Sequence, residues 1–264
     1  MSGGQGIIES ASSEWIKFRT IRSTIYTLVV TFVLCVGLGA LISFGRSQHA
    51  LRQGGGGLLA DPTRVSLQGF SIAEIAIGVI GVLIISSEYA TGSIRATLAA
   101  TPRRGTVLVA KTLVLFIATL RIGEACSFLS FFVGQAIIRG QGVNSATLSS
   151  PGAFRGVALA GLSLALLAVF AMGIATMLRH TAGSITAYVA LLLVTFLLLA
   201  PLPVDWQHRV SKFLPEVLTS SMRAATSAGS DFSTFSALTS TLVLAAYALA
   251  AVIGGAYLLH RRDA

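Results

Sequence analysis

The chain has 264 residues, of which 54% are hydrophobic and 11% are charged. A soluble domain usually carries about a quarter charged residues, and here the apolar residues come in long uninterrupted blocks, so the composition is that of a membrane-helix protein. The formal net charge is +9. The basic residues gather at the ends of the apolar blocks, which is typical of membrane flanks and argues against nucleic-acid binding.

Short motifs that mark common enzymes are missing from the sequence. It contains no Walker-type ATP-binding loop, no H-E-x-x-H zinc motif and no G-x-S-x-G nucleophile elbow. The histidines are scattered, and Cys35 and Cys126 lie inside apolar blocks, so we expect neither a metal site nor a disulfide framework. We therefore expect a chain that is not an enzyme by itself and binds no cofactor.

The polar N-terminus lacks a cleavable signal pattern, so we expect the first apolar block to be kept as a membrane helix. Before it, residues 13–24 follow a helix start and are amphipathic with a basic polar face, which predicts a helix lying in the membrane interface. The alternative is that this stretch only leads into the first span. The apolar side holds Trp15, Phe18, Ile21 and Ile25, and the polar side Lys17, Thr20 and Thr24.

A membrane span needs about 20 mostly apolar residues. By this rule we expect an all-α integral membrane protein with a single domain over 1–264. Its six spans cover about 25–44, 67–87, 107–138, 154–178, 183–200 and 237–259. The third is about 48 Å long as one straight helix, so it tilts, breaks near Gly123 or protrudes.

The connections differ in character. The stretches 45–66 and 139–153 are rich in glycine and serine and predict loops. The stretch 201–236 contains apolar residues at helical spacing, which predict one short amphipathic helix that packs on the membrane surface or dips into it. These residues are Val210, Phe213, Leu214, Val217 and Leu218.

The lysines and arginines fall into two groups by the side of the membrane. One group holds Lys17, Arg19, Arg22, Arg95, Arg103, Arg104, Lys111, Arg179, Arg261 and Arg262. The other holds Arg46, Arg52, Arg64, Arg139, Arg155, Arg209, Lys212 and Arg223. The first group lies in short segments directly against the spans, so the positive-inside rule places both termini and residues 88–111 in the cytoplasm.

The segment 88–111 has the most informative local pattern. Its markers, in chain order, are Glu88, Tyr89, Gly92, Ile94, Leu98 and Pro102. The acidic–aromatic pair closes an apolar helix, and the glycine breaks it. The two aliphatic residues share one face of a helix of about two turns over 93–100, which the proline ends.

The stretch SSEYATGSIRATLAATPRRGTVLVAK resembles the region after the second span in ABC-2 type ABC-transporter permeases, especially the small bacterial single-domain ones. The stretch SEWIKFRTIRSTIYTL is similar to the interfacial helix of that family, and the six-span plan matches as well. The matching residues in the first stretch are Glu88, Tyr89, Gly92, Ile94, Leu98, Pro102, Arg104 and Lys111. Those in the second are Glu14, Lys17, Arg19, Thr20, Arg22 and Ser23. Ala90 stands where the family commonly has a basic or polar residue.

The resemblance implies a permease that pairs into a dimer, with itself or with a paralogous permease, in the bacterial cell membrane. Two cytoplasmic ATPase subunits would bind it and carry the ATP and Mg. The coupling contacts would come from Glu88, Tyr89, Gly92, Ile94, Arg95, Leu98, Pro102 and Arg104, and a second contact from Glu14, Lys17, Arg19 and Arg22. For Arg95, Arg103 and Arg104, plain membrane anchoring is the alternative.

The expected activity is export of a drug, antibiotic, lipid or peptide. An ATP-independent six-span carrier or channel, and a non-transporting anchor or sensor, are the alternatives.

Three ionisable residues, Glu74, Arg121 and Glu124, fall inside predicted spans. Glu74 lies about 21 Å along the helix from Glu88, and Arg121 about 21 Å from Val107, so the two should share one depth. Glu124 is one turn from Arg121 and can also pair with it. We expect a Glu74–Arg121–Glu124 cluster, which either pins the second and third spans together, the simpler role, or lines and gates the translocation path.

Overall fold

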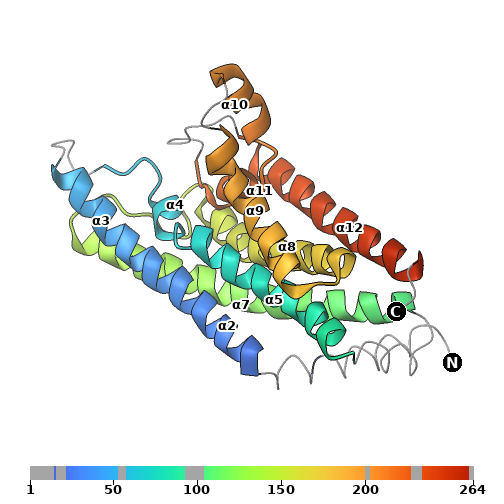
Figure 1. Ribbon diagram of the computed structural model, residues 1–264. Coiled ribbons are helices and arrows are strands. Elements are labelled where there is room, and N and C mark those ends of the chain that lie inside the picture. Colours follow the sequence, from blue (N-terminus) through green and yellow to red (C-terminus); the bar gives the residue numbers. More distant parts are fainter. Residues whose placement is uncertain are drawn as a thin grey trace.

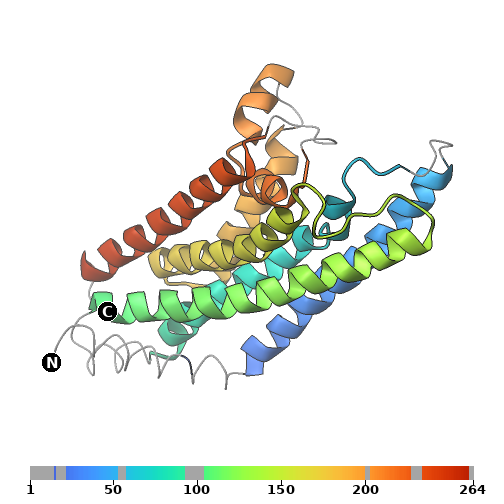
Figure 2. The same ribbon diagram turned by 180° about the vertical axis from the view of Figure 1, so that it is seen from behind.

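The computed structural model describes residues 15, 22–52, 58–92, 104–199, 203–226 and 234–261. In this part every regular element is helical, and the long helices lie side by side in one bundle (Figures 1 and 2). Four helices are long and apolar enough to cross a membrane, and they confirm the first, second, fourth and sixth predicted spans as helices of that kind. They cover Ile25–Arg52, Phe70–Tyr89, Ala153–Leu178 and Ala237–Leu259. The third and fifth predicted spans also form helices, and the count of six spans stays a prediction.

The first membrane helix is longer than expected. It runs without interruption through α2 (Arg22–Val33), the π-helical η1 (Leu34–Leu38) and α3 (Gly39–Arg52), so the predicted end at residue 44 is wrong. Gly45 faces open space and does not stop the helix. In the π-helical turn the carbonyl of Cys35 accepts from the Gly39 N–H of the same helix and also from Ser130 Oγ of α7, at 3.1 Å.

The predicted loop 45–66 also contains a short helix, α4 (Pro62–Ser66). Asp61 caps it, because its Oδ1 accepts a hydrogen bond from the Arg64 N–H at 3.0 Å. Pro62 occupies the first helical position. The N–H of that position makes no bond within a helix, so proline loses nothing there.

Helix α8 (Ala153–Leu178) is the centre of the bundle, and α5 (Phe70–Thr91), α7 (Arg104–Gly140) and α12 (Ala237–Arg261) pack around it (Figures 1 and 2). It is apolar on all sides, as expected of a buried helix. The 37 residues of α7 form one unbroken helix of about 56 Å, so there is no break near Gly123. Instead, Gly123 lies directly against the backbone of Gly161 on α8.

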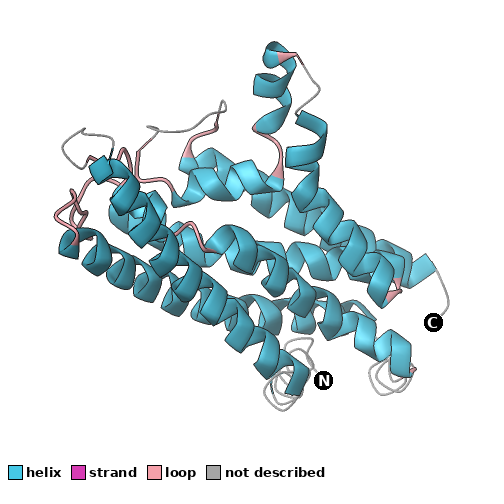
Figure 3. Ribbon diagram, turned by 60° about the vertical axis from the view of Figure 1, so that its left-hand side comes forward, coloured by secondary structure: helices cyan, strands magenta, loops and turns pink. Residues whose placement is uncertain are grey.

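The connection after α9 (Thr181–Leu199) contains two helices where we expected one. They are α10 (Val204–Ser211) and α11 (Pro215–Arg223), and α10 projects from one end of the bundle (Figures 1 and 3). Pro215 explains the division, because proline starts a helix well but cannot continue one. In α11 Val217 and Leu218 are buried, whereas Val210 and Phe213 are exposed.

The described members of the two groups of basic residues lie at opposite ends of the bundle. One end collects the start of α2, the end of α5, the start of α7 and the end of α12 (Figures 1 and 2). It holds Lys111, Arg179 and Arg261. The other end holds Arg52 and Arg139, among others. We call these the coupling end and the loop end; that the coupling end faces the cytoplasm stays a prediction.

Close packing of α5 on α8 predicts that Gly81→Ala destabilises the protein. A methyl group there would run into the backbone oxygen of Ala168, so the two helices must separate, at a cost of about 1–3 kcal/mol. Thermal unfolding of the purified chain in mild detergent measures this loss. The matched control is Gly45→Ala, which meets open space and should unfold no earlier than the wild type. Equal stability of the two variants would contradict the packing.

Candidate functional site

At the coupling end, a buried ion pair joins the last turns of α5 to the first turns of α7. Lys111 Nζ donates a hydrogen bond to Glu88 Oε1 at 2.7 Å, and the two side chains are only 1% and 11% exposed. A buried pair of this kind holds only if both partners stay in place. The pair therefore fixes the two roots of the segment 88–111, whose middle, residues 93–103, lies outside the described residues.

The predicted glycine break is confirmed. Gly92 caps α5 in the left-handed conformation, with a φ of 70° that a residue with a side chain rarely adopts. Its N–H donates to Tyr89 O at 3.2 Å. Glu88 and Tyr89 thus lie in the last turn of α5, immediately before the chain changes direction.

Arg179, expected only as a membrane flank, connects two further helices, α8 and α12, to α5 at the same end. It caps α8 in the left-handed conformation, with a φ of 56°. Its guanidinium lies 5.4 Å from the ring centroid of Tyr89, and its Nη2 donates to Leu258 O of α12 at 3.5 Å. The link between α8 and α9 is very short, which is the sequence signal that a special backbone conformation is needed there. Together with the Glu88–Lys111 pair, Arg179 ties α5, α7, α8 and α12 into one base.

Other predicted contact residues lie outside the described residues. They are Ile94, Arg95, Leu98 and Pro102 of the coupling segment, and Glu14, Lys17 and Arg19 of the interfacial helix. Arg22 and Arg104 begin α2 and α7, but the contacts of their side chains are not described. The roles of these residues stay predictions.

A second buried ion pair lies toward the loop end. Glu74 on α5 is fully buried, and its Oε1 accepts from Nη1 of Arg223 on α11, which is 3% exposed. Arg223 Nη2 also donates to Ser71 Oγ at 3.1 Å and lies 3.6 Å from Glu216 Oε1. Burial opposes the charged form of Arg223, but the carboxylates of Glu74 and Glu216 outweigh it. The pKa of Arg223 is therefore above its usual value.

Helix α9 joins the same site. The Tyr188 hydroxyl donates to the backbone carbonyl of Glu74 at 2.7 Å, and the ring is fully buried. Gly78 makes room for it, because any side chain there would overlap the Tyr188 ring. The site therefore holds α5, α9 and α11 together.

The predicted cluster of Glu74, Arg121 and Glu124 is not formed. Glu74 forms its ion pair with Arg223 instead. Arg121 is exposed on the outer side of α7, and Glu124 is half-buried against Gly161 of α8. Equal depth along two helices did not suffice, because the two side chains also have to point at each other. Arg223 was grouped with the basic residues of the loops and was therefore not considered as the partner of Glu74. The sequence signal for this partner is the position of Arg223 at the end of an amphipathic stretch that starts at a proline.

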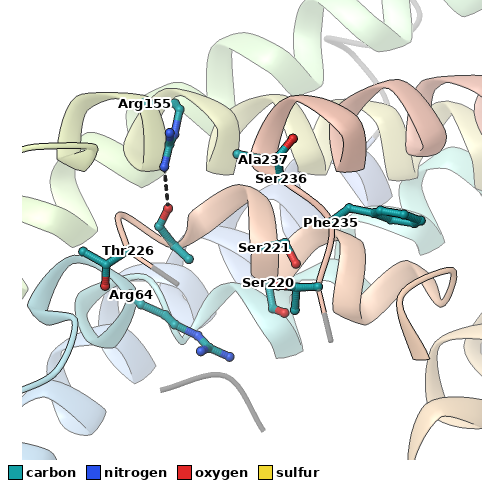
Figure 4. A pocket seen from close by; sticks show the side chains of 10 residues that line it. Arg64, Arg155, Ser220, Ser221, Thr226, Phe235, Ser236 and Ala237 are labelled. Atoms are coloured by element: carbon teal, nitrogen blue, oxygen red, sulfur yellow. Dashed lines mark hydrogen bonds between the residues drawn. The ribbon is translucent and has the colours of Figure 1, made fainter. Parts of the chain in front are cut away.

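The chain after α11 is anchored at the loop end. Asp61 Oδ2 accepts from the N–H groups of Ala225 and Thr226 at 2.8 and 3.1 Å, and Arg155 Nη2 donates to Ala225 O at 3.2 Å. Arg155 Nη2 also donates to Ala224 O at 3.3 Å, and Figure 4 shows this hydrogen bond beside a pocket of about 250 Å³. Hydroxyl and guanidinium groups line it, among them Arg64, Arg155, Ser220, Ser221, Thr226 and Ser236.

A larger cavity of about 500 Å³ lies over α8, flanked by α9 and α12. Its lining is apolar and aromatic and includes Phe170, Leu191, Phe213 and Tyr247. The Tyr247 hydroxyl already donates to Phe213 O at 3.1 Å, so this cavity offers contact area to an apolar group and little hydrogen bonding.

The described residues contain no group of three or more histidine, cysteine, aspartate or glutamate side chains placed to hold a metal ion. No protein-family model and no curated protein matches the sequence. The candidate site is therefore defined by the two buried ion pairs on α5.

The Glu74–Arg223 pair predicts that Arg223→Gln is strongly destabilising, by about 3–5 kcal/mol, because the Glu74 carboxylate is left buried without its cation. The measurement is thermal unfolding of the full chain in mild detergent. Arg209→Gln, on the exposed helix α10, is the control and should leave stability unchanged.

The double variant Glu74→Gln/Arg223→Gln removes both charges and should recover part of the loss. If Arg223→Gln alone is as stable as the control, the pair does not hold α11 in place.

Proposed function

We propose that this chain is the membrane-spanning permease subunit of an ATP-driven transporter of the ABC-2 type. It works as a dimer with two copies of a separate cytoplasmic ATPase subunit, and it exports a drug, antibiotic, lipid or peptide across the bacterial cell membrane. The observation that carries the proposal is the buried Glu88–Lys111 pair at the roots of the segment 88–111.

A permease that hydrolyses no ATP has to receive mechanical work from its partner. A slack loop would absorb the partner's motion, whereas a segment fixed at both roots passes it to the helices. The Glu88–Lys111 pair supplies this fixation, and Arg179 extends it to α8 and α12. The segment 88–111 is therefore a suitable handle for an ATPase.

Helix α5 connects the segment 88–111 to the opposite end of the bundle. Glu88 and Glu74 lie on the same unbroken helix, about 21 Å apart, and each is held by a cation from another helix. Close contacts at Gly81 with α8 and at Gly78 with Tyr188 hold α5 against its neighbours. A displacement at the coupling end would thus reach α11 at the loop end through a stiff helix.

The apolar cavity over α8 supports a substrate with a hydrophobic part. Drugs and lipids meet this condition readily, and so do apolar peptides. An ATP-independent carrier or channel could use the same cavity, but it needs no fixed handle at residues 88–111.

The test is purification of the chain from its native membranes in mild detergent, with the co-purifying proteins identified by mass spectrometry. We expect a stoichiometric cytoplasmic protein that contains an ATP-binding loop. Recovery of the chain alone, under conditions in which an established ABC complex stays intact, would contradict the proposal and favour the carrier, channel or anchor alternatives.

A further inference from the structure

An arginine interrupts the apolar outer face of α7. Exposed residues recur there at every fourth position, and all except one are apolar. They are Val109, Leu113, Ile117, Arg121, Ala125 and Leu129. Figure 2 shows α7 running across the front of the bundle with no other helix in front of it.

Arg121 lies near the middle of this helix, about 26 Å from its first residue and about 28 Å from its last. If α7 spans the bilayer, the membrane surface is about 15 Å away on either side, which is beyond the reach of an arginine side chain. Charged groups at this depth are rare on a lipid-facing surface and usually meet a partner.

Glu124 is the neighbour of opposite charge, one turn further along α7. It is half-buried against Gly161 of α8. Within the described part of the chain, neither the Arg121 side chain nor that of Glu124 has an ion pair or a hydrogen bond. Helix α7 therefore carries a cation on its outer face and an anion at the edge of that face, where it meets α8, and within the described residues neither side chain has a partner.

We propose that a second copy of this chain covers the outer face of α7, with Arg121 of each copy paired to Glu124 of the other. A two-fold axis brings the same patch of both copies together. If the patch carries one charge of each sign, each charge can pair with the opposite charge of the other copy. Ala125 beside the two charges leaves room for the helices to approach closely.

The other outward apolar faces do not call for a partner of this kind. The exposed residues of α2 and α12, such as Val29, Val33, Leu242 and Leu249, lie in the stretches 25–44 and 237–259, which contain no aspartate, glutamate, lysine, arginine or histidine, so these faces can meet lipid. Charge complementarity therefore singles out α7. The inference rests on the proposed function only in taking the permease as a dimer.

The test is charge exchange in the full chain, reconstituted without any ATPase in lipid vesicles and followed by energy transfer between differently labelled copies. Arg121→Glu alone, or Glu124→Arg alone, places like charges together and should weaken dimer formation about tenfold or more. The double exchange Arg121→Glu/Glu124→Arg restores opposite charges and should return the affinity to within about threefold of the wild type. Arg139→Glu, exposed at the end of α7, is the control and should have no effect.

A second measurement does not depend on the charge variants folding. Ala125→Cys should cross-link between copies in the membrane, whereas Ala246→Cys on the outer face of α12 should not, and the native Cys35 and Cys126 are buried. The proposal is overturned if Ala125→Cys gives no cross-link, if the single exchanges leave the dimer unchanged, or if the double exchange is no better than the singles. Because the ATPase is absent, these outcomes are independent of the purification that tests the transporter function.

Discussion

Burial of Glu74 is the constraint on which the loop end of the structure depends. A carboxylate that is fully excluded from water inside an apolar bundle keeps its charge only beside a cation, and Arg223 on α11 supplies it. This need for a cation holds α11 against α5, and Tyr188 of α9 donates to the backbone carbonyl of the same glutamate. At the other end of α5, Glu88 makes the same demand and Lys111 meets it. Helix α5 therefore connects two buried ion pairs, one at each end of the bundle.

Helix α7 has a different character on each side. Gly123 lies against Gly161 so closely that α7 and α8 are in backbone contact, and α7 continues through Gly123 without a break, which was one of the three alternatives for this long span. The opposite side carries Arg121 in an apolar row. If a second copy covers that side, the contact between copies is attached directly to α8, the central helix. Motion at the coupling segment and contact between copies would then meet in the same packed core.

The sequence predicted the elements better than their orientation. Apolar blocks gave the helices, and the glycine at 92 gave the end of α5, because length and backbone preference are local properties. The partner of Glu74 was missed, because residue counting gives depth along a helix and says nothing about the direction in which a side chain points. The long α3 and the short α4 were missed as well. Both lie wholly or partly in the stretch 45–66, whose glycines and serines predicted a loop, but α3 continues through Gly45, and Asp61-Pro62 starts a helix.

The central claim is that the buried pair at the roots of the segment 88–111 passes the work of the ATPase to the helices. The most direct measurement compares substrate-stimulated ATP hydrolysis of the wild-type complex with that of Glu88→Gln/Lys111→Gln, which removes both charges of the pair. The account predicts that the complex still assembles while stimulation falls by about tenfold. Unchanged stimulation, in a variant that is folded and bound to its ATPase, would contradict it.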